Sequence, residues 1–245
     1  MIRTEGLKKI YRVGNEKVAA LAGINLEIKQ GEVCCIVGQS GSGKSTLLNM
    51  LAGLEKPTKG SITIAGEKIS HMDEEELAIF RQNNLGFIFQ SYFLLQQLTA
   101  VENAAIPLMF SGMDKVKREK RAMRELKMVG LAERASHRPT EMSGGQQQRV
   151  GIARAFVTRP KVIFADEPTG NLDTQTTEQV LKAMLGRISK YGITLVMVTH
   201  EPSIAACGDR IVTLSDGKII KDEYLKKSEE NVKETKKAKV AEEKA

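Results

Sequence analysis

Short apolar runs separated by glycine, proline and charged residues recur along the chain. The most continuous of them predict buried strands: residues 33–37 (VCCIV), 161–166 (KVIFAD) and 193–199 (ITLVMVT). Residues 44–54 have helical character, and Gly53 and Pro57 end that segment. A second helix is expected from Gly145 to about Thr158. Strands that alternate with helices favour an α/β fold with a parallel sheet and helices on both of its faces.

The N-terminal part of the chain has a different pattern. Residues 1–30 are typical of short strands and turns, because apolar and polar residues alternate around Leu26 and Ile28. Residues 60–69 (GSITIAGEKI) suit a hairpin or an edge strand, and residues 73–82 begin with the acidic turn that marks a helix start. We therefore expect an N-terminal antiparallel β subdomain beside the parallel sheet.

Residues 97–140 are charged and carry few strand signals, and we expect a helical subdomain of about residues 91–158 inserted into the α/β core. Within it, residues 115–131 (KVKREKRAMRELKMVGL) keep four apolar side chains near helical spacing: Ala122, Met123, Leu126 and Val129. The charges between them indicate a solvated helix face, and contact with lipid headgroups is the alternative.

The two ends of the chain bear on its location. No stretch approaches the roughly 18 apolar residues of a membrane span, and residues 1–14 hold no apolar signal segment. We expect the protein to stay in the cytosol and to reach a membrane only through a partner. Residues 1–225 are expected to form the folded domain, whereas residues 226–245 are charged and almost without apolar side chains, which predicts a disordered tail.

The net charge of +7 raises the question of a nucleic-acid partner. Aromatic residues make up only 4% of the chain and tryptophan is missing, so a platform for stacking bases is not indicated and we expect no nucleic acid. Binding of nucleotide phosphates or of an anionic membrane surface would equally account for a basic chain. Cys34 and Cys35 are adjacent inside an apolar run, which predicts small core residues rather than a metal or redox pair.

Residues 38–45 (GQSGSGKS) match the phosphate-binding pattern G-x-x-x-x-G-K-[ST] and follow a predicted strand and precede a predicted helix. Glycines let the backbone wrap closely around phosphates, and the start of a helix adds partial positive charge. Lys44 is placed to reach the β- and γ-phosphates, and Ser45 to bind Mg²⁺. The residues expected to contact ATP here are Gly38, Gln39, Ser40, Gly41, Ser42, Gly43, Lys44, Ser45 and Thr46.

Two adjacent carboxylates end the predicted strand of residues 161–166. The carboxyl ends of parallel strands are where α/β sheets bind ligands. We expect Asp166 to complete the Mg²⁺ site with Ser45. Strand alternation would direct Glu167 the other way, toward a water in line with the γ-phosphate, as a general base.

Residues 142–149 (MSGGQQQR) resemble the signature LSGGQ of the ABC ATPases, with Met142 in place of the usual leucine. The resemblance extends over roughly residues 1–225. It implies a P-loop NTPase core and a dimer, in which this helix start of one subunit faces the phosphate loop of the other and sandwiches ATP. The residues that the resemblance places on the partner's nucleotide are Ser143, Gly144, Gly145 and Gln146.

Four further residues match landmarks of the same family. Tyr11 resembles the aromatic residue that stacks on adenine, although a surface tyrosine is the alternative. Gln90 resembles the glutamine that joins Mg²⁺ and the attacking water to the helical subdomain. Asp173, in GNLD, resembles the loop residue that crosses the dimer interface. His200 resembles the histidine that holds the γ-phosphate and orients Glu167, whereas His71 and His137 lack such a context and are expected on the surface.

The sequences of residues 90–108 and of the segment PTGNLD resemble those of the LolD/MacB-type group of ABC transporter ATPases. Members of that group pair with permeases that have a large extracytoplasmic domain, and they drive lipoprotein release or export of peptides, antibiotics or haem. The resemblance therefore implies an ATP- and Mg²⁺-dependent ATPase, expected as a homodimer on the cytoplasmic face of the cell membrane. A cell-division relative, which signals to wall hydrolases without transport, is the alternative.

Overall fold

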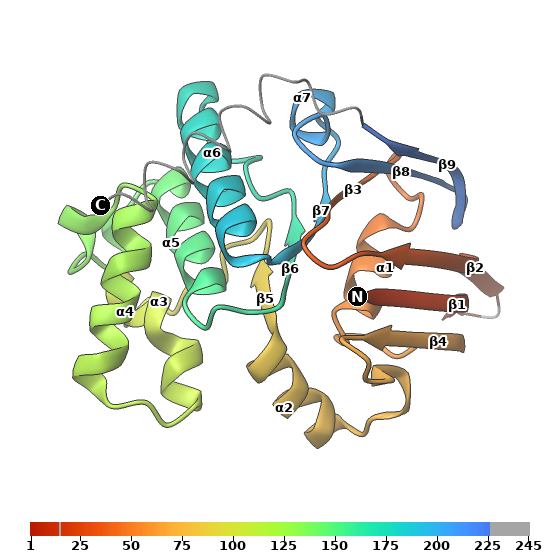
Figure 1. The fold of residues 1–245 in the computed structure, drawn as a ribbon, viewed down its shortest axis with the longest axis horizontal. Helices are drawn as coiled ribbons and strands as arrows, with labels where there is room; N and C mark the ends of the chain where they lie inside the picture. Colours follow the sequence, from red (N-terminus) through yellow and green to blue (C-terminus); the bar gives the residue numbers. More distant parts are fainter. Residues whose placement is uncertain (15, 226–245) are drawn as a thin grey trace.

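The structure is a computed structural model that describes residues 1–14 and 16–225 (Figure 1). The tail predicted for residues 226–245 lies outside the described residues. A three-stranded antiparallel sheet forms first, in the order β2-β1-β4. Its strands are β1 (Ile2–Val13), β2 (Glu16–Ile28) and β4 (Lys59–Ile64). β4 lies at an edge of this sheet, as predicted for residues 60–69.

A six-stranded sheet forms the centre of the molecule, in the order β5-β6-β7-β3-β8-β9. The first five strands in that order run parallel, and β9 pairs antiparallel with β8. Its strands are β3 (Val33–Val37), β5 (Leu85–Ile88), β6 (Val162–Asp166), β7 (Thr194–Val198), β8 (Arg210–Ser215) and β9 (Lys218–Tyr224). The predicted α/β fold with a separate antiparallel sheet is therefore confirmed.

Alternation along the central strands divides the core into two halves. Cys34 and Ile36 point to one face of β3, where they pack with the three-stranded sheet and α1 (Lys44–Leu51). Val33 and Cys35 point to the other face. Both thiols are therefore buried, as predicted, and burial raises the pKa of Cys35 to about 12.

Helices cover both faces of the six-stranded sheet. α1 and α2 (Glu74–Asn84) share the core half of the three-stranded sheet, and α5 (Gly144–Phe156) and α6 (Thr174–Tyr191) pack on the other face. α3 (Ala100–Phe110) and α4 (Lys115–Met128) lie beside α5, far from the three-stranded sheet (Figure 1). The short elements are η1 (Ile69–His71), η2 (Ala132–Arg134), η3 (Pro139–Glu141) and α7 (Pro202–Ala205).

Capping side chains explain where the helices begin. Thr99 and Glu102 form a capping box at the start of α3, and Asp73 and Glu76 form another at α2.

In α4 the apolar stripe is buried at Ala122 and Leu126, while Met123 stays 38% exposed because it lies one position away from that stripe.

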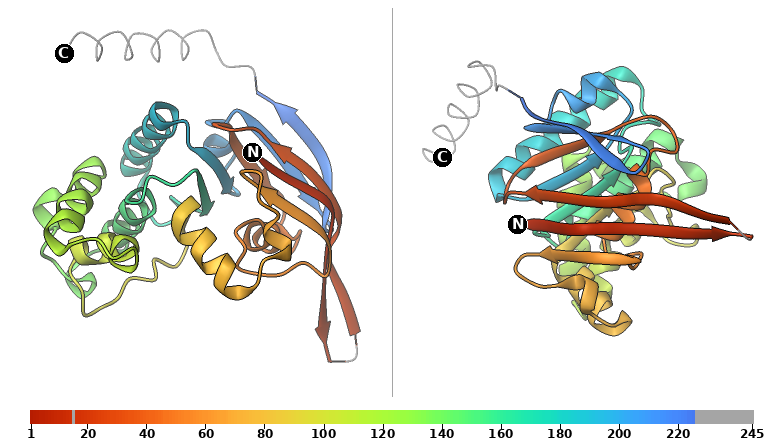
Figure 2. Two further views of the ribbon diagram at one scale, coloured as in Figure 1. Left: turned by 60° about the horizontal axis from the view of Figure 1, so that its bottom comes forward. Right: turned by 90° about the vertical axis from the view of Figure 1, so that its right-hand side faces the viewer.

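The N-terminal strands are longer than the short strands and turns that the sequence predicts. β1 has 12 residues and β2 has 13. Gly6 and Gly23 have positive φ angles and lie where the β1–β2 register shifts. These glycines therefore form β-bulges, which bend paired strands without ending them. Figure 2 shows β1, β2 and β4 side by side, with β9 against β2.

Candidate functional site

The loop of residues 38–45 leaves the carboxyl end of β3 and turns into α1. Gly43 caps the helix with a φ of 98°, and a Cβ atom there would lie 2.5 Å from the Ala20 carbonyl oxygen. A larger residue is therefore excluded. The Lys44 ammonium lies inside the loop, where it donates 2.8 Å hydrogen bonds to the carbonyl oxygens of Gly38 and Gln39. The loop can thus offer helix-start amides and a cation to a phosphate group.

Asp166 ends β6 next to this loop, near enough to the Ser45 hydroxyl for that group to lower the pKa of its carboxyl. Burial raises the pKa of Asp166, and the charge of Glu167 raises it further, while Ser45 and Lys44 oppose both effects. The structure therefore brings together the predicted phosphate and metal ligands Lys44, Ser45 and Asp166. A neighbouring hydroxyl and carboxylate suit a Mg²⁺ ion, which prefers oxygen ligands.

Glu167 is held from both sides by residues that follow neighbouring strands. Its Oε1 lies 2.7 Å from Nδ1 of His200, which follows β7. Its Oε2 accepts a 3.0 Å hydrogen bond from Nε2 of Gln90, which follows β5. The predicted residues Gln90, Glu167 and His200 thus form one hydrogen-bonded group.

The expectation that strand alternation aims Glu167 has to be corrected. β6 ends at Asp166, and Glu167 itself has a left-handed φ of 45°. Its backbone N–H donates to the Val198 carbonyl oxygen over 3.0 Å, which fixes this turn to β7. Non-glycine residues adopt this conformation rarely, and such strain gathers at functional sites.

The predicted signature turn forms the start of α5. Ser143 is its N-cap and forms a capping box with Gln146, with bonds of 3.0 and 3.3 Å. Ser143 and Gly144 are exposed, so this helix start is open at the surface. α5 and α1 lie on opposite sides of the six-stranded sheet (Figures 1 and 2).

Asp173 caps α6, where it accepts bonds from the backbone N–H and the hydroxyl of Thr176. These bonds lower the pKa of Asp173, so the exposed side chain is an anion at neutral pH. Two residues that sequence reasoning missed hold the backbone at and before Gln90. Asn171 donates to the Gln90 carbonyl oxygen over 3.2 Å, and the buried Gln148 donates to the Phe89 and Pro168 carbonyl oxygens. A glutamine in a polar run carries no sequence signal for such a role.

Tyr11 lies half-buried on β1, where burial raises its pKa and the Thr46 side chain at the start of α1 lowers it. Its hydroxyl also donates to Oε2 of Glu55 over 2.8 Å, and the Lys9 ammonium lies 5.2 Å from the ring centre. Tyr11 is therefore beside the phosphate loop, and its stacking on adenine stays a prediction. Val18 pairs with Tyr11 across β1 and β2.

The two remaining histidines differ in burial. His71 is exposed, as expected, whereas His137 is half-buried, and its Nε2 lies 2.9 Å from the Arg134 guanidinium. The expectation of a surface residue was therefore only partly right for His137.

An open cavity adjoins Gln90 on the side of the helical segment. Phe93 is 67% exposed there and stacks edge-on against Phe89. The residues lining the cavity are Gln90, Ser91, Tyr92, Phe93, Leu94, Gln96, Gln147 and Asn171.

Comparison with known proteins identifies relatives that all belong to one family. Residues 21–170 match the model of the ABC transporter family. The lipoprotein-releasing system ATP-binding protein LolD of Chromohalobacter salexigens is 42% identical over 222 residues, which cover 91% of this chain and 94% of that protein. The macrolide export ATP-binding/permease protein MacB of Chlorobaculum tepidum is 46% identical over 91% of this chain, which spans 34% of that longer protein.

The solved structure of the ATP-binding cassette MJ0796 of Methanocaldococcus jannaschii, a dimer in a post-hydrolysis state with ADP and Pi, superposes with a TM-score of 0.89. It is 42% identical and covers 93% of this chain and all of that one. Within residues 1–14 and 16–225, no helix is both long and apolar enough to cross a lipid bilayer. The chain belongs to the ABC transporter family as an ATP-binding cassette, with LolD- and MacB-type proteins among its relatives.

Proposed function

We propose that this cassette hydrolyses ATP with the help of Mg²⁺ and that two copies enclose two nucleotides. The observation that carries the proposal is the position of Glu167, which His200 and Gln90 hold beside Asp166. A carboxylate whose two oxygens are both fixed by neighbouring strands is oriented before the substrate binds, which is what a general base requires.

The phosphate loop binds the triphosphate. The Lys44 ammonium exchanges the carbonyl oxygens of Gly38 and Gln39 for β- and γ-phosphate oxygens. Thr46 donates to the α-phosphate. Ser45, Asp166 and Gln90 hold Mg²⁺, which when bound neutralises charge on the phosphate oxygens.

Glu167 accepts the proton of the attacking water, while His200 keeps its carboxylate aimed and contacts the γ-phosphate. Tyr11 stacks on adenine at the other end of the nucleotide. Gln90 connects this centre to the helical subdomain of residues 91–158, and the ATPase domain as a whole spans residues 1–225.

The second copy completes each site. Because α5 and α1 lie on opposite faces of the sheet, the exposed Ser143 turn is free to meet the phosphate loop of a partner. A helix start attracts anions through its unpaired N–H groups. Ser143, Gly144, Gly145 and Gln146 then face the γ-phosphate across the interface, and Asp173 lies between the two sites.

The substitution Glu167→Gln tests the assignment, because an amide cannot accept the proton of the water. ATP turnover should fall by roughly 10²–10⁴-fold, while ATP binding persists and ATP-dependent dimers accumulate in size-exclusion chromatography. The control is Glu178→Gln, an exposed glutamate on α6, which should keep wild-type turnover. Hydrolysis by Glu167→Gln at the wild-type rate would remove Glu167 from the role of base.

We further propose that the cassette works at the cytoplasmic face of the cell membrane with a permease that has a large extracytoplasmic domain. The cavity beside Gln90, with the exposed Phe93, suits a helix of that permease. The names of the relatives, for macrolide export and lipoprotein release, support export or extraction. The proposed substrate is a peptide, lipoprotein, antibiotic or haem-like compound.

A photo-crosslinking residue at position 93 in cells tests this docking, with position 220, exposed on β9, as the control. The expected product joins the cassette to a permease from position 93 only. A conjugate with a membrane regulator of wall hydrolases would support the cell-division role instead, and equal yields from both positions would remove the docking site.

A further inference from the structure

The tip of the β8–β9 hairpin contacts the backbone of the phosphate loop at Ser42. The Gly217 N–H donates to the Ser42 carbonyl oxygen over 3.1 Å, and the Gly217 carbonyl oxygen accepts a 2.9 Å bond from the Ala22 N–H on β2. One residue of the hairpin thus connects the loop to the three-stranded sheet, although more than 170 positions separate Gly217 from Ser42 in the sequence.

These contacts are made between backbones at distances that leave no room for a side chain. A Cβ atom on Gly217 would lie 2.6 Å from the Ala20 carbonyl oxygen and 3.0 Å from the Leu21 Cα. A Cβ atom on Gly38 would lie 2.3 Å from the carbonyl oxygen of Leu214 in β8. The loop therefore lies directly on the hairpin at two places.

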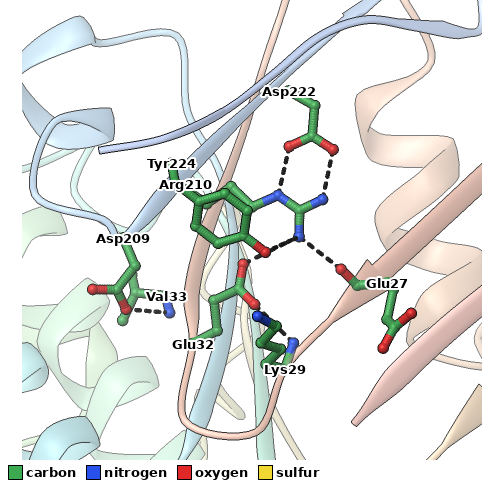
Figure 3. A network of polar contacts seen from close by, with 8 residues as sticks. All are labelled: Glu27, Lys29, Glu32, Val33, Asp209, Arg210, Asp222 and Tyr224. Atoms are coloured by element: carbon green, nitrogen blue, oxygen red, sulfur yellow. Dashed lines mark hydrogen bonds and ion pairs between the residues drawn. The ribbon is translucent and has the colours of Figure 1, made fainter. Parts of the chain in front are cut away.

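The other end of the hairpin is anchored to the turn between β2 and β3, as Figure 3 shows. Arg210 is only 6% exposed, and its guanidinium donates two 2.5 Å bonds to Asp222 on β9 and a 2.7 Å bond to the Glu27 carbonyl oxygen. It also contacts Glu32 and the hydroxyl of Tyr224. Paired bonds between a guanidinium and a carboxylate fix both partners in orientation.

We propose that the β8–β9 hairpin positions the phosphate loop for the nucleotide, with Gly217 as the positioning residue. The Ser42 carbonyl and the Gly43 N–H belong to one planar trans peptide, so they point in opposite directions. Gly217 holds the carbonyl on the outside of the loop and thereby directs the Gly43 N–H to the inside, where phosphates bind. This inference rests on the proposed binding of ATP by the loop.

Two glycines in equivalent turns provide a matched pair of variants. Asp216 and Gly217 form a two-residue turn with φ angles of 48° and 70°, and Ala65 and Gly66 form another with 54° and 90°. A Cβ atom on Gly66 meets nothing within 4 Å. Alanine therefore strains the backbone at both turns but displaces the hairpin only at position 217.

The first readout is ATP affinity, measured for the folded full chain by fluorescent-nucleotide titration. Gly217→Ala should raise the Kd by about tenfold, the effect of one well-placed hydrogen bond, whereas Gly66→Ala should stay within about twofold. Equal losses in both variants, or an unchanged Kd in Gly217→Ala, would overturn the proposal.

The second readout is amide hydrogen exchange in the nucleotide-free protein. Gly217→Ala should speed exchange in residues 38–46 and leave β7 at its wild-type rate, whereas general destabilisation would speed both. This readout needs no nucleotide. It therefore distinguishes a failure of the hairpin to position the loop from a failure of the loop to bind ATP. Faster exchange of the loop with unchanged affinity would also count against a positioning role.

A variant at the anchored end covers the case in which Gly217→Ala does not fold. Asp222→Asn weakens the Arg210 bonds without contact to the loop, and it should raise the Kd for ATP by about threefold with faster exchange in residues 38–46. Lys221→Gln, on the exposed side of β9, is the control. An Asp222→Asn protein with the wild-type Kd for ATP and the wild-type hydrogen-exchange rate in residues 38–46 would refute the proposal that the hairpin positions the loop.

Discussion

Glu167 and Asp166 are neighbours in sequence that the protein holds in different ways. Glu167 has a left-handed backbone and is fixed by His200 and Gln90, whereas Asp166 is desolvated at the end of β6 beside Ser45. Strained conformations of this kind cost about 1–3 kcal/mol each. At the scale of residues, the site therefore reduces the stability of the fold in exchange for oriented carboxylates.

The raised pKa of Asp166 leads to a pH prediction. The unfolded chain has the ordinary value of 3.8, so the folded state binds the proton more tightly and its stability falls as the pH rises from about 4 through the raised pKa. The substitution Asp166→Asn removes this loss. Without nucleotide at pH 7, the variant should melt above the wild type.

The same melting curves contain their own control. Below about pH 4 the difference between Asp166→Asn and wild type should shrink, because both side chains are then neutral. Addition of Mg²⁺ and ATP should reverse the order, since only the carboxylate helps to hold the metal. A variant that melts below the wild type at pH 7 without nucleotide contradicts the prediction.

At the scale of elements, one buried ion pair ties α4 of the helical segment to α6 of the core. Glu125 is 3% exposed and pairs with Arg187, and Arg187 and Arg159 also lie over the ring of Tyr191. Burial raises the pKa of Glu125, and the charge of Arg187 is the main opposing effect. The pair therefore matters most through what its loss would leave behind, a buried carboxylate without its hydrogen-bond donor.

Replacing one member of this pair should be costly. Arg187→Met should lower the free energy of unfolding in urea by about 2 kcal/mol at pH 7, because the buried Glu125 carboxylate loses its hydrogen-bond donor and keeps only the more distant charges of Arg121 and Arg159. The loss should shrink as the pH falls through the raised pKa of Glu125, where the carboxyl becomes neutral.

Two comparisons make that measurement decisive. The double variant Glu125→Leu with Arg187→Met should recover most of the loss, because no buried charge remains. Lys115→Met, in the exposed pair of Lys115 with Glu119, should cost less than about 0.5 kcal/mol. Equal costs for Arg187→Met and Lys115→Met would show that burial does not set the strength of the pair.

At the scale of the whole molecule, the two helix starts suited to phosphate lie on α1 and α5, on opposite faces of the central sheet. One chain cannot turn both toward the same nucleotide without breaking that sheet. Two copies related by a twofold axis can, because each then offers its Ser143 turn to the phosphate loop of the other. The dimer of the similar cassette MJ0796 is consistent with this arrangement.

The dimer prediction uses a double variant. In a Glu167→Gln background, Ser143→Arg should abolish ATP-dependent dimers in light scattering, because a large side chain fills the interface. The Kd of the monomer for ATP should stay within about threefold, since α1 is untouched. Ser111→Arg, exposed after α3, is the control that should still dimerise. Loss of ATP binding by the Ser143→Arg monomer would contradict the composite site.

Local patterns in the sequence were enough to predict the α/β core, the phosphate loop and the carboxylates at the end of β6. These features depend on neighbours within one strand, loop or helix, such as the apolar run before Gly38 or the Ser143 cap of α5. The juxtaposition of Gln90, Glu167 and His200 was reached through likeness to a family, since nothing local joins three segments so far apart.

Which backbones meet in the folded protein could not be predicted from local patterns. The apolar content of β5, β8 and β9 is low or interrupted, so their pairing depends on neighbours from distant parts of the chain. Gly217 has the local sequence of an ordinary turn glycine, and its contacts with Ser42 and Ala22 exist because β8 pairs with β3. Local sequence thus specifies the chemical groups and their immediate geometry. Long-range strand pairing specifies what supports them, because such contacts leave no periodic pattern in either segment.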